Sequence, residues 1–254
     1  MTGAFAIGIV GGRGAMGDWF VRFFRDRGYP VHISERDRDL PLEELTRLCK
    51  VVIVSVPIDI TPSVINQVGP LLARDALLMD LTSLKSAPMR AMLAATRAEV
   101  IGLHPLFGPD VRDMTGQNIV LCPGRGATWL PWTREALASG GAVVVETSPE
   151  RHDAMMAVIQ GLNHLNTMTL GLILREAGLD PAELERFSTP AFRNKTTMIE
   201  KVFTQNPRLY ADIVVGNPAL APLLDLYESV LARLARAVRS GNPESLAAIL
   251  KDRP

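Results

Sequence analysis

One histidine in this 254-residue sequence is placed where it could act as a base in catalysis. His104 ends the predicted strand "VIGLH" and opens the loop "HPLFGPD". Ligands of parallel-sheet α/β folds bind at the carboxyl edge of the sheet, where this loop begins. Because the pKa of imidazole lies near neutrality, His104 could accept a proton from a hydroxyl group that is being oxidised. We expect His32, inside a strand, and His152, on an acidic and exposed helix start, to be structural or solvated.

The loop after the preceding strand carries further polar groups at the same predicted edge. In "DLTSLKS", Asp80, Thr82, Ser83 and Lys85 follow a short apolar run. The Ser83 hydroxyl could orient a substrate hydroxyl or hold the imidazole, but serine also commonly caps a helix N-terminus. Both interpretations of Ser83 stay open, and Lys85 could add positive charge.

Later segments add candidates for substrate binding. The apolar helix segment "GLNHLN" contains Asn163, His164 and Asn166, and "STPAFRNKTT" places Arg193 and Lys195 near the start of another helix. Buried polar groups cost free energy unless they are satisfied, so polar residues in an apolar helix indicate a binding surface. The planar guanidinium of Arg193 suits a carboxylate. The alternatives are a hydrogen-bonded core histidine and a solvated surface arginine.

A glycine turn near the N-terminus predicts a dinucleotide site. Gly12, Gly14 and Gly17 in "GIVGGRGAMG" follow a predicted strand and open a helix with the spacing G-x-G-x-x-G. Such a turn lets the backbone approach a pyrophosphate at the positive helix N-terminus. Glu35, at the end of the next strand, suits the ribose hydroxyls and favours NAD over NADP, whereas Arg36 could stabilise a 2′-phosphate. The predicted cofactor-binding residues are Gly12, Gly14, Ala15, Met16, Gly17, Glu35, Arg36, Ser55, Val56 and Pro57.

These residues require a sheet whose strands end at one edge. Short apolar runs predict strands at Phe5–Gly11, Pro30–Ser34, Val51–Val56, Leu77–Leu81, Val100–Leu103, Asn118–Cys122 and Ala142–Glu146. Helical periodicity predicts helices at Met16–Arg27, Leu42–Leu48, Thr61–Leu72, Ala87–Ala95 and Trp132–Ser139. This alternation predicts right-handed crossovers and an α/β, doubly wound (Rossmann) parallel sheet over residues 1–148.

Residues 149–254 are predicted to form a second, all-helical domain. Strand-like runs vanish after "VVVETSPERHDAMM", and Asp180-Pro181, Ser188–Pro190, Asn206-Pro207 and Asn217-Pro218 interrupt the helical pattern. The first helix begins with the cap Ser148-Pro149-Glu150 and runs to Gly178. It is too apolar for a surface element, so we expect burial within the domain and against a second subunit.

Composition narrows the classes of function. The formal net charge is zero and no long basic run occurs, so we expect no nucleic-acid partner. No apolar run is long enough to span a bilayer and the N-terminus lacks the basic region of a secretory signal, so we expect no membrane partner. Cys49 and Cys122 lack metal-ligand spacing and fit a reduced, cytoplasmic compartment, and we predict no metal site.

Taken together, these segments resemble the prephenate dehydrogenase (TyrA) family. The segments "GIVGGRGAMG", "VVIVSVPI", "DLTSLKS", "GLHPLFGPD", "ERHDAMMAVIQGLNH", "STPAFR" and "NPRLYADIV" occur in the family's order and spacing. The form is similar to the dehydrogenase part of bacterial enzymes that are fused to chorismate mutase, although we expect no mutase segment here.

The resemblance implies NAD-dependent oxidative decarboxylation of prephenate to 4-hydroxyphenylpyruvate. His104 would take the proton of the 4-hydroxyl as hydride leaves C4, and Ser83 would hydrogen-bond the histidine and that hydroxyl. His164 would be a second substrate-site histidine, and Arg193 would hold the side-chain carboxylate. The helical domain would form a homodimer, with the substrate between the two domains.

The resemblance leaves the substrate open. Other members carry a further arginine in a segment of the type F-x-D-x-T-R, where this sequence has Thr197 in "FRNKTTM". Arg193 or Lys195 would then have to compensate. Arogenate and 4-amino-4-deoxyprephenate, which differ from prephenate by an amino group, are the alternative substrates. A β-hydroxyacid dehydrogenase, an imine reductase and a non-enzymatic redox sensor are the alternative classes.

Overall fold

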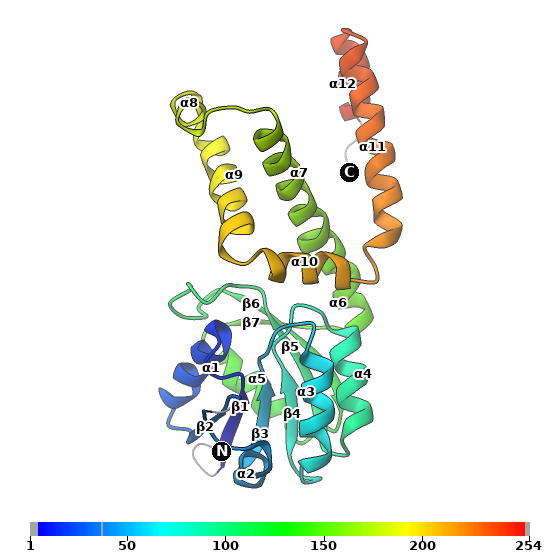
Figure 1. Ribbon diagram of the computed structural model, residues 1–254. Helices are drawn as coiled ribbons and strands as arrows, with labels where there is room; N and C mark the ends of the chain where they lie inside the picture. The colour runs from blue at the N-terminus through cyan, green and yellow to red at the C-terminus, as the bar shows by residue number, and fades with distance from the viewer. Residues whose placement is uncertain (1–4, 37, 252–254) are drawn as a thin grey trace.

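The computed structural model of the chain describes residues 5–36 and 38–251, in an α/β part and a helical part (Figure 1). The strands are β1 (Ala6–Val10), β2 (Val31–Ser34), β3 (Cys49–Val54), β4 (Leu77–Asp80), β5 (Glu99–Pro105), β6 (Asn118–Arg125) and β7 (Val143–Glu146). Between them lie α1 (Ala15–Arg25), α2 (Leu42–Leu48), α3 (Thr61–Val68), the 3-10 turn η1 (Gly69–Leu71), α4 (Ser86–Ala95) and α5 (Leu130–Ala138). Each predicted strand and helix of this part is present, with ends that differ by a few residues.

The strands form one seven-stranded sheet in the order β2-β1-β3-β4-β5-β6-β7. The doubly wound fold is confirmed, with one difference: β6 runs antiparallel to β5, and β7, which is parallel to β6, also runs opposite to the first five strands. Residues 106–117 between these strands form no helix, so the chain turns straight back instead of crossing over. The strand order reverses between β1 and β3, and the turns that follow these two strands meet at the carboxyl edge.

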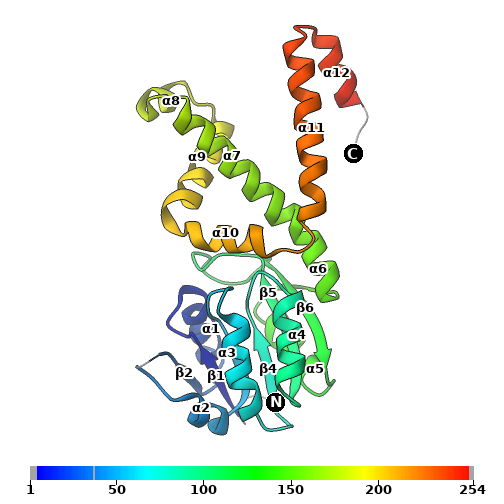
Figure 2. The ribbon, with the colours of Figure 1, turned by 45° about the vertical axis from the view of Figure 1, so that its right-hand side comes forward.

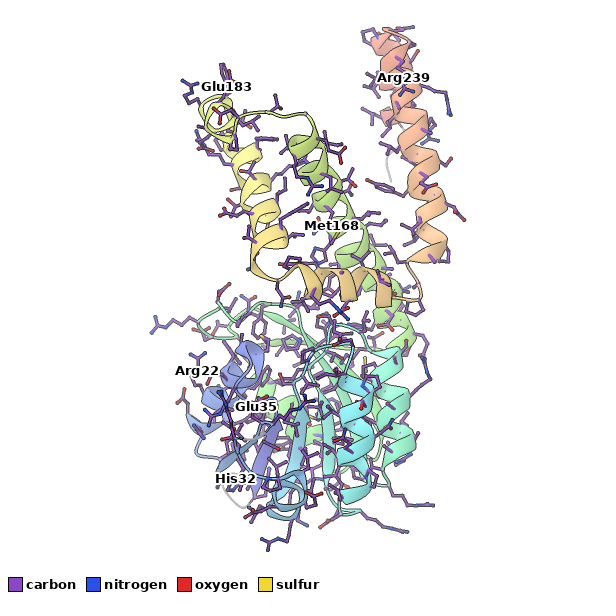
Figure 3. The ribbon with its side chains drawn as sticks, viewed as in Figure 1. Arg22, His32, Glu35, Met168, Glu183 and Arg239 are labelled. Atoms are coloured by element: carbon purple, nitrogen blue, oxygen red, sulfur yellow. The ribbon has the colours of Figure 1, made fainter. Side chains whose placement is uncertain are left out.

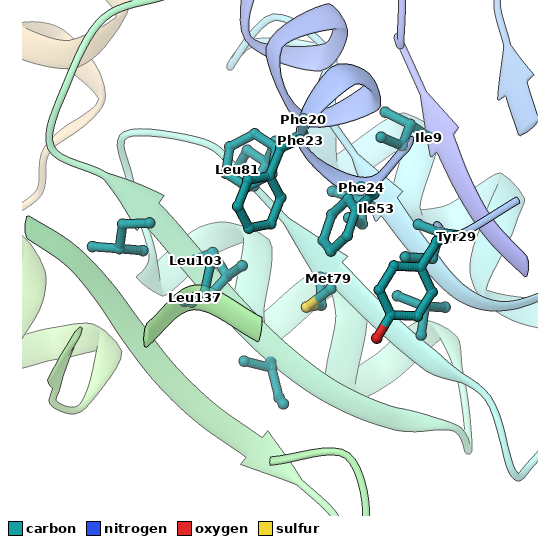
Figure 4. Packing of buried hydrophobic residues seen from close by; sticks show 14 of the residues in the cluster. Ile9, Phe20, Phe23, Phe24, Tyr29, Ile53, Met79, Leu81, Leu103 and Leu137 are labelled. Carbon is teal, nitrogen blue, oxygen red and sulfur yellow. The ribbon is translucent and has the colours of Figure 1, made fainter. Parts of the chain in front are cut away.

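Alternate residues of the central strands pack on opposite faces of the sheet. In β3, Val51 and Ile53 pack in the core with α1 and α5, whereas Val52 and Val54 pack in the core with α2, α3 and α4. The first core is rich in aromatic residues, and Figure 4 shows Phe20, Phe23, Phe24 and Tyr29 gathered over the strands. This packing fixes α1 with its N-terminus at the carboxyl end of β1.

Two glycines at the junction of β1 and α1 have no room for a side chain. Gly11 has φ +79°, and a side chain there would collide with the backbone oxygen of Ser55. A side chain on Gly17 would collide with the carbonyl oxygen of Gly11. Hydrogen bonds from Gly11 N to Ser34 O (2.9 Å) and from Ser55 N to Val10 O (2.8 Å) tie the ends of the first three strands together.

The helical part begins with α6 (Pro149–Met156), passes through the π-helical turn η2 (Ala157–Leu162) and continues as α7 (Asn163–Glu176). It then forms α8 (Pro181–Phe187), α9 (Pro190–Glu200), the π-helical turn η3 (Lys201–Gln205), α10 (Pro207–Gly216), α11 (Ala221–Arg239) and α12 (Pro243–Lys251). The side chains of Asp180, Thr189 and Asn206 cap α8, α9 and α10, so the predicted breaks are confirmed. Figures 1 and 2 show α10 lying across the edge of the α/β part, while α11 stands away from it.

The long helix predicted from Ser148 to Gly178 is present, but only part of its surface is buried in the single chain. Ile159 and Ile173 are each 56% exposed. Burial of this helix against a second subunit therefore stays a prediction. Among residues 5–36 and 38–251, no single helix is long and apolar enough to cross a bilayer, and α10 with α11 passes that test only as a pair bent by 101°.

Candidate active site

His104 lies in β5 at the carboxyl edge of the sheet and is only 3% exposed. Its Nδ1 atom is 2.8 Å from Nε2 of His152, and Nδ1 of His152 is 2.8 Å from Oδ1 of Asp153. The three side chains therefore form a continuous hydrogen-bonded chain from β5 to α6. The expectation that His152 lies on an exposed helix start was wrong, because α6 packs against α4 and against His104 of β5, which leaves His152 1% exposed.

Asp153 joins the helical part to the α/β part. Its carboxylate accepts hydrogen bonds from the backbone amides of Lys85 (2.8 Å) and Ser86 (2.9 Å) at the start of α4. Its backbone oxygen accepts a hydrogen bond from Nδ2 of Asn217 (2.9 Å), in the turn between α10 and α11. Burial raises the pKa of Asp153, but hydrogen bonds from His152, Ser86 and the Lys85 amide outweigh this and lower the pKa to about 2. The carboxylate is therefore ionised at neutral pH.

The environment of His104 keeps its ring neutral. Burial lowers the pKa of His104 well below its ordinary value, and the positive charge of nearby Lys85 lowers this pKa further. A neutral imidazole can accept a proton, which is what a base in the oxidation of a hydroxyl must do.

A buried ion pair holds the loop that follows β4. Nζ of Lys85 bonds to Oδ2 of Asp80 and to the backbone oxygen of Leu103 (2.7 Å), the residue before His104. Both charged side chains are fully buried. The positive charge expected from Lys85 is therefore present, but Asp80 already pairs with it.

Ser83 lies half-buried in the same loop, close in sequence to the start of α4. Since α4 begins at Ser86, Ser83 is not its N-cap, and that alternative is wrong. Among the hydrogen bonds of residues 5–36 and 38–251, none joins Ser83 to His104. A role of Ser83 in catalysis stays a prediction.

Two buried polar atoms on the long helix have no hydrogen-bond partner among the described side chains. These atoms are Oε1 of Gln160 and Nδ1 of His164, which lie one helical turn apart. Nε2 of Gln160 is 3.5 Å from Nε2 of His104. The His164 ring packs edge-on against Tyr210 of α10, and burial lowers the pKa of His164. Both atoms are therefore placed to form a hydrogen bond with a polar ligand.

The predicted cofactor residues meet at the same edge of the sheet. Gly14 precedes α1, which begins with Ala15 and Met16, and a Cβ on Gly14 would meet only backbone oxygens, at 3.3 and 3.9 Å. Glu35 directly follows β2, and Figure 3 shows it nearer the helical part than His32 of the same strand. The helix N-terminus thus opens beside a carboxylate, an arrangement that fits a pyrophosphate linked to a ribose. The exposed Arg36 lies next to Glu35, and Ser55, Val56 and Pro57 follow β3.

Arg193 and Lys195 lie in the half of α9 that is far from the sheet, toward α8 (Figure 1). Nε of Arg193 is 2.7 Å from Oε1 of Glu185 in α8, and both side chains are exposed. Figure 3 shows the neighbouring Glu183 at this outer end of the molecule. Lys195 lines a cavity of about 270 Å³ between α7 and α9, together with Asn163 and Asn166. The single chain does not bring these two cations to His104, so their contact with a substrate stays a prediction.

Two cations that the sequence did not single out lie closer to the α/β part. Nζ of Lys201 is 3.2 Å from Oδ2 of Asp110, in the loop after His104, and a terminal nitrogen of Arg208 is 3.0 Å from Oδ2 of Asp59. These partners are 91 and 149 residues apart in the sequence, so no local pattern marks them.

Comparison with known proteins matches both parts of the chain to one family. Residues 32–146 match the model of the prephenate dehydrogenase nucleotide-binding domain, and residues 148–252 match the model of the prephenate dehydrogenase dimerization domain. The T-protein of Haemophilus influenzae is 39% identical over 209 residues, which are 82% of this chain and 55% of that protein. The probable arogenate/prephenate dehydrogenase of Methanocaldococcus jannaschii is 31% identical, over 97% of this chain and 59% of that protein. The chain thus spans little more than half the length of these curated relatives.

The fold is shared with a solved prephenate dehydrogenase from A. aeolicus, in complex with hydroxyphenyl propionate and NAD+. The two structures have a TM-score of 0.78 at 21% sequence identity, over 99% of this chain and 95% of that chain. At this identity the likeness concerns the fold.

Proposed function

Because the chain belongs to the prephenate dehydrogenase family, we propose that it catalyses the NAD-dependent oxidative decarboxylation of prephenate to 4-hydroxyphenylpyruvate. The observation that carries this proposal is the buried, neutral His104 at the carboxyl edge of the sheet. The unpartnered oxygen of Gln160 and ring nitrogen of His164 support a polar substrate next to it.

In the proposed reaction, His104 acts as the base. NAD bound at the glycine turn supplies the acceptor for a hydride from C4 of the substrate. Nε2 of His104 takes the proton of the 4-hydroxyl, so that C4 becomes a carbonyl carbon. The ring carboxylate leaves as carbon dioxide, its bonding electrons restore the aromatic ring, and the oxygen recovers a proton. In this proposal, Ser83 hydrogen-bonds the hydroxyl and holds it toward His104.

The remaining predicted residues have binding roles in this proposal. Arg193 and Lys195 bind the substrate carboxylates, and His164 is a neutral hydrogen-bond partner of the substrate. Gly12–Gly17 would hold the pyrophosphate of NAD, Glu35 and Arg36 its adenosine ribose, and Ser55–Pro57 its nicotinamide ribose. The open N-terminus of α1 supports this placement, and a 2′-phosphate would meet the Glu35 carboxylate, which favours NAD over NADP.

We also propose that residues 149–254 form a homodimer, with residues 1–148 as the dinucleotide-binding domain. The match to a dimerization domain supports this proposal, as do the exposed apolar side chains of α11. Leu226 and Val238 of that helix are 60% and 65% exposed in the single chain.

Arogenate and 4-amino-4-deoxyprephenate are the alternative substrates. A compound with a 4-amino group has no 4-hydroxyl proton to lose, so it does not need a base at this position. The presence of His104 therefore favours a 4-hydroxy compound, but it does not separate prephenate from arogenate.

Measuring NADH and NADPH formation with these three compounds tests the proposal. We expect turnover of prephenate with NAD. His104→Asn should lower kcat by about 10²–10⁴-fold, because asparagine cannot accept the proton, with little change in the Kd of NAD. His32→Asn is the matched control, since β2 is separated from β5 by three strands. Tight NAD binding without turnover of any compound would contradict the enzyme proposal, and near-normal turnover by His104→Asn would indicate a different base.

A further inference from the structure

We propose that His152 and Asp153 are positioning residues that hold His104 in the tautomer with a free lone pair on Nε2. The catalytic consequence rests on the proposed function, whereas the tautomer can be measured without substrate. The proposal starts from two contacts, Asp153 Oδ1 to His152 Nδ1 and His152 Nε2 to His104 Nδ1, each 2.8 Å long.

The charge of Asp153 sets the direction of each hydrogen bond. An ionised carboxylate only accepts, so Nδ1 of His152 carries a proton. A neutral His152 then has no proton on Nε2, which accepts the hydrogen bond donated by Nδ1 of His104. The lone pair of His104 is left on Nε2, on the side of Gln160. A doubly protonated His152 would give the opposite result, because its Nε2–H would face Nδ1 of His104 and force the proton of His104 onto Nε2.

The proposal concerns the form of His152 that carries one proton, and few charged groups surround the two rings. Asp153 contributes one negative charge from α6, while Lys85 contributes a positive charge from the loop before α4 and is paired with Asp80. The η2 turn contributes the uncharged Gln160. Both rings are almost completely buried, so a cation on His152 in the resting protein would add a desolvation cost beside the ammonium of Lys85.

The hydrogen bonds from His104 to His152 and Asp153 also matter during the reaction. When His104 accepts the substrate proton, the ring becomes a cation whose Nδ1–H still points at His152. Because Asp153 polarises the His152 ring, the new positive charge is stabilised through two hydrogen bonds. Without His152, Nδ1–H of His104 would be buried without an acceptor and the ring could change its tautomer.

Nitrogen NMR of protein labelled with ¹⁵N-histidine tests the tautomer directly. The chain has four histidines, so single variants can identify each signal. Near neutral pH we expect both His104 and His152 to carry one proton, on Nδ1, and to show an unprotonated Nε2. A proton on Nε2 of His104, or two protons on His152, would overturn the inference.

Two variants of His152 test the consequence for catalysis. His152→Gln keeps an acceptor close to the position of Nε2, whereas His152→Leu removes it. We expect His152→Leu to lower kcat by about 10–100-fold with little change in KM, and to convert His104 to a mixture of tautomers. His152→Gln should retain most of the kcat and the Nδ1–H tautomer of His104. His32→Gln, on the far edge of the sheet, is the control for a histidine change.

The outcomes separate this inference from the proposed function. If the wild-type protein turns over none of the three compounds, the proposed function fails, while the NMR spectrum still decides the tautomer. If turnover is normal and His104 carries its proton on Nε2, the proposed function stands and the inference fails. If His152→Leu does not fold, the wild-type spectrum and His152→Gln remain decisive. A kcat of His152→Leu equal to that of the wild type would also overturn the positioning role.

Discussion

Gly14 in the turn after β1 and Gly17 in the first turn of α1 are required for different physical reasons. A Cβ on Gly17 would overlap the carbonyl oxygen of Gly11 and lie 2.9 Å from the Cα atom of Gly12, so the fold itself excludes a side chain. A Cβ on Gly14 would lie 3.3 Å from its nearest neighbour, the oxygen of Gly11, so the folded chain can tolerate it. At Gly14 the restriction comes from the ligand, because the backbone must approach a pyrophosphate closely.

Alanine substitutions should separate these two reasons. Gly17→Ala should lower the free energy of unfolding by about 1–3 kcal/mol, the usual cost of overpacking. Gly14→Ala should leave the Tm almost unchanged but weaken NAD binding by at least about tenfold, which thermal unfolding and calorimetric titration of both variants would measure. An unchanged Kd for Gly14→Ala would contradict the proposed position of the pyrophosphate.

His104 could be predicted from the sequence, whereas the role of His152 could not. His104 is marked by a local pattern, a buried strand that ends in a turn. The position of His152 depends on where α6 docks, which is set by contacts such as that between Asp153 and the Lys85 amide, 68 residues apart. Acidic neighbours indicate exposure on average, but a carboxylate that caps another helix is buried together with its neighbours.

At the scale of elements, the continuous helix of α9 and η3 connects α8 with the edge of the sheet. Arg193 pairs with Glu185 at one end, and Lys201 pairs with Asp110 at the other. Both ion pairs are exposed and contribute little stability. Either cation could therefore exchange its present partner for a carboxylate of the substrate.

A pair of alanine variants distinguishes the two ends of this helix. We expect Arg193→Ala to raise the KM for prephenate by about 10–100-fold with little change in kcat, because a charge-assisted hydrogen bond to the carboxylate is lost. Lys201→Ala is the comparison on the same helix, and steady-state kinetics measures both. If only Lys201→Ala raises the KM, the carboxylate binds at the end near the sheet and the role proposed for Arg193 is wrong.

Elements could be predicted where their signal is local. Alternating apolar runs identify the strands, and proline after a polar cap identifies the starts of α6, α8, α9 and α10. The direction of β6 depends instead on how residues 106–117 return, and apolar alternation does not encode it. The π-helical turn Ala157–Leu162 was not predicted either, because periodicity identifies a helix without locating a local widening of its turns.

At the scale of the whole molecule, α11 has apolar side chains that the single chain leaves exposed to solvent. Figure 2 shows α11 standing away from the α/β part, and Leu226, Leu231 and Val238 on it are 60%, 51% and 65% exposed. An apolar surface of this kind is typical of a protein interface. A second copy of the chain, as expected for a dimerization domain, would cover it.

A charge placed in this surface should prevent dimerisation. Leu231→Glu should give a monomer near 27.7 kDa, because a carboxylate would be buried without a partner in an apolar interface. Ala232→Glu adds the same charge on the opposite face, which carries Glu228 and Arg236, each four residues away, and should remain a dimer. Light scattering after size exclusion gives both masses. A dimer of Leu231→Glu would place the interface elsewhere.

The contacts of Asp153 also limit how the two parts of the chain can move. One carboxylate holds the start of α4, its backbone oxygen holds the turn between α10 and α11, and all of these groups are buried. At the other end of the boundary, the ion pairs between the two parts that the structure describes are the exposed pairs Arg208–Asp59 and Lys201–Asp110. If the helical part moves relative to the α/β part, the movement would therefore pivot about Asp153. The histidine pair would stay fixed near the pivot, while α10 and the loop after His104 would make the larger displacement as substrate enters and product leaves.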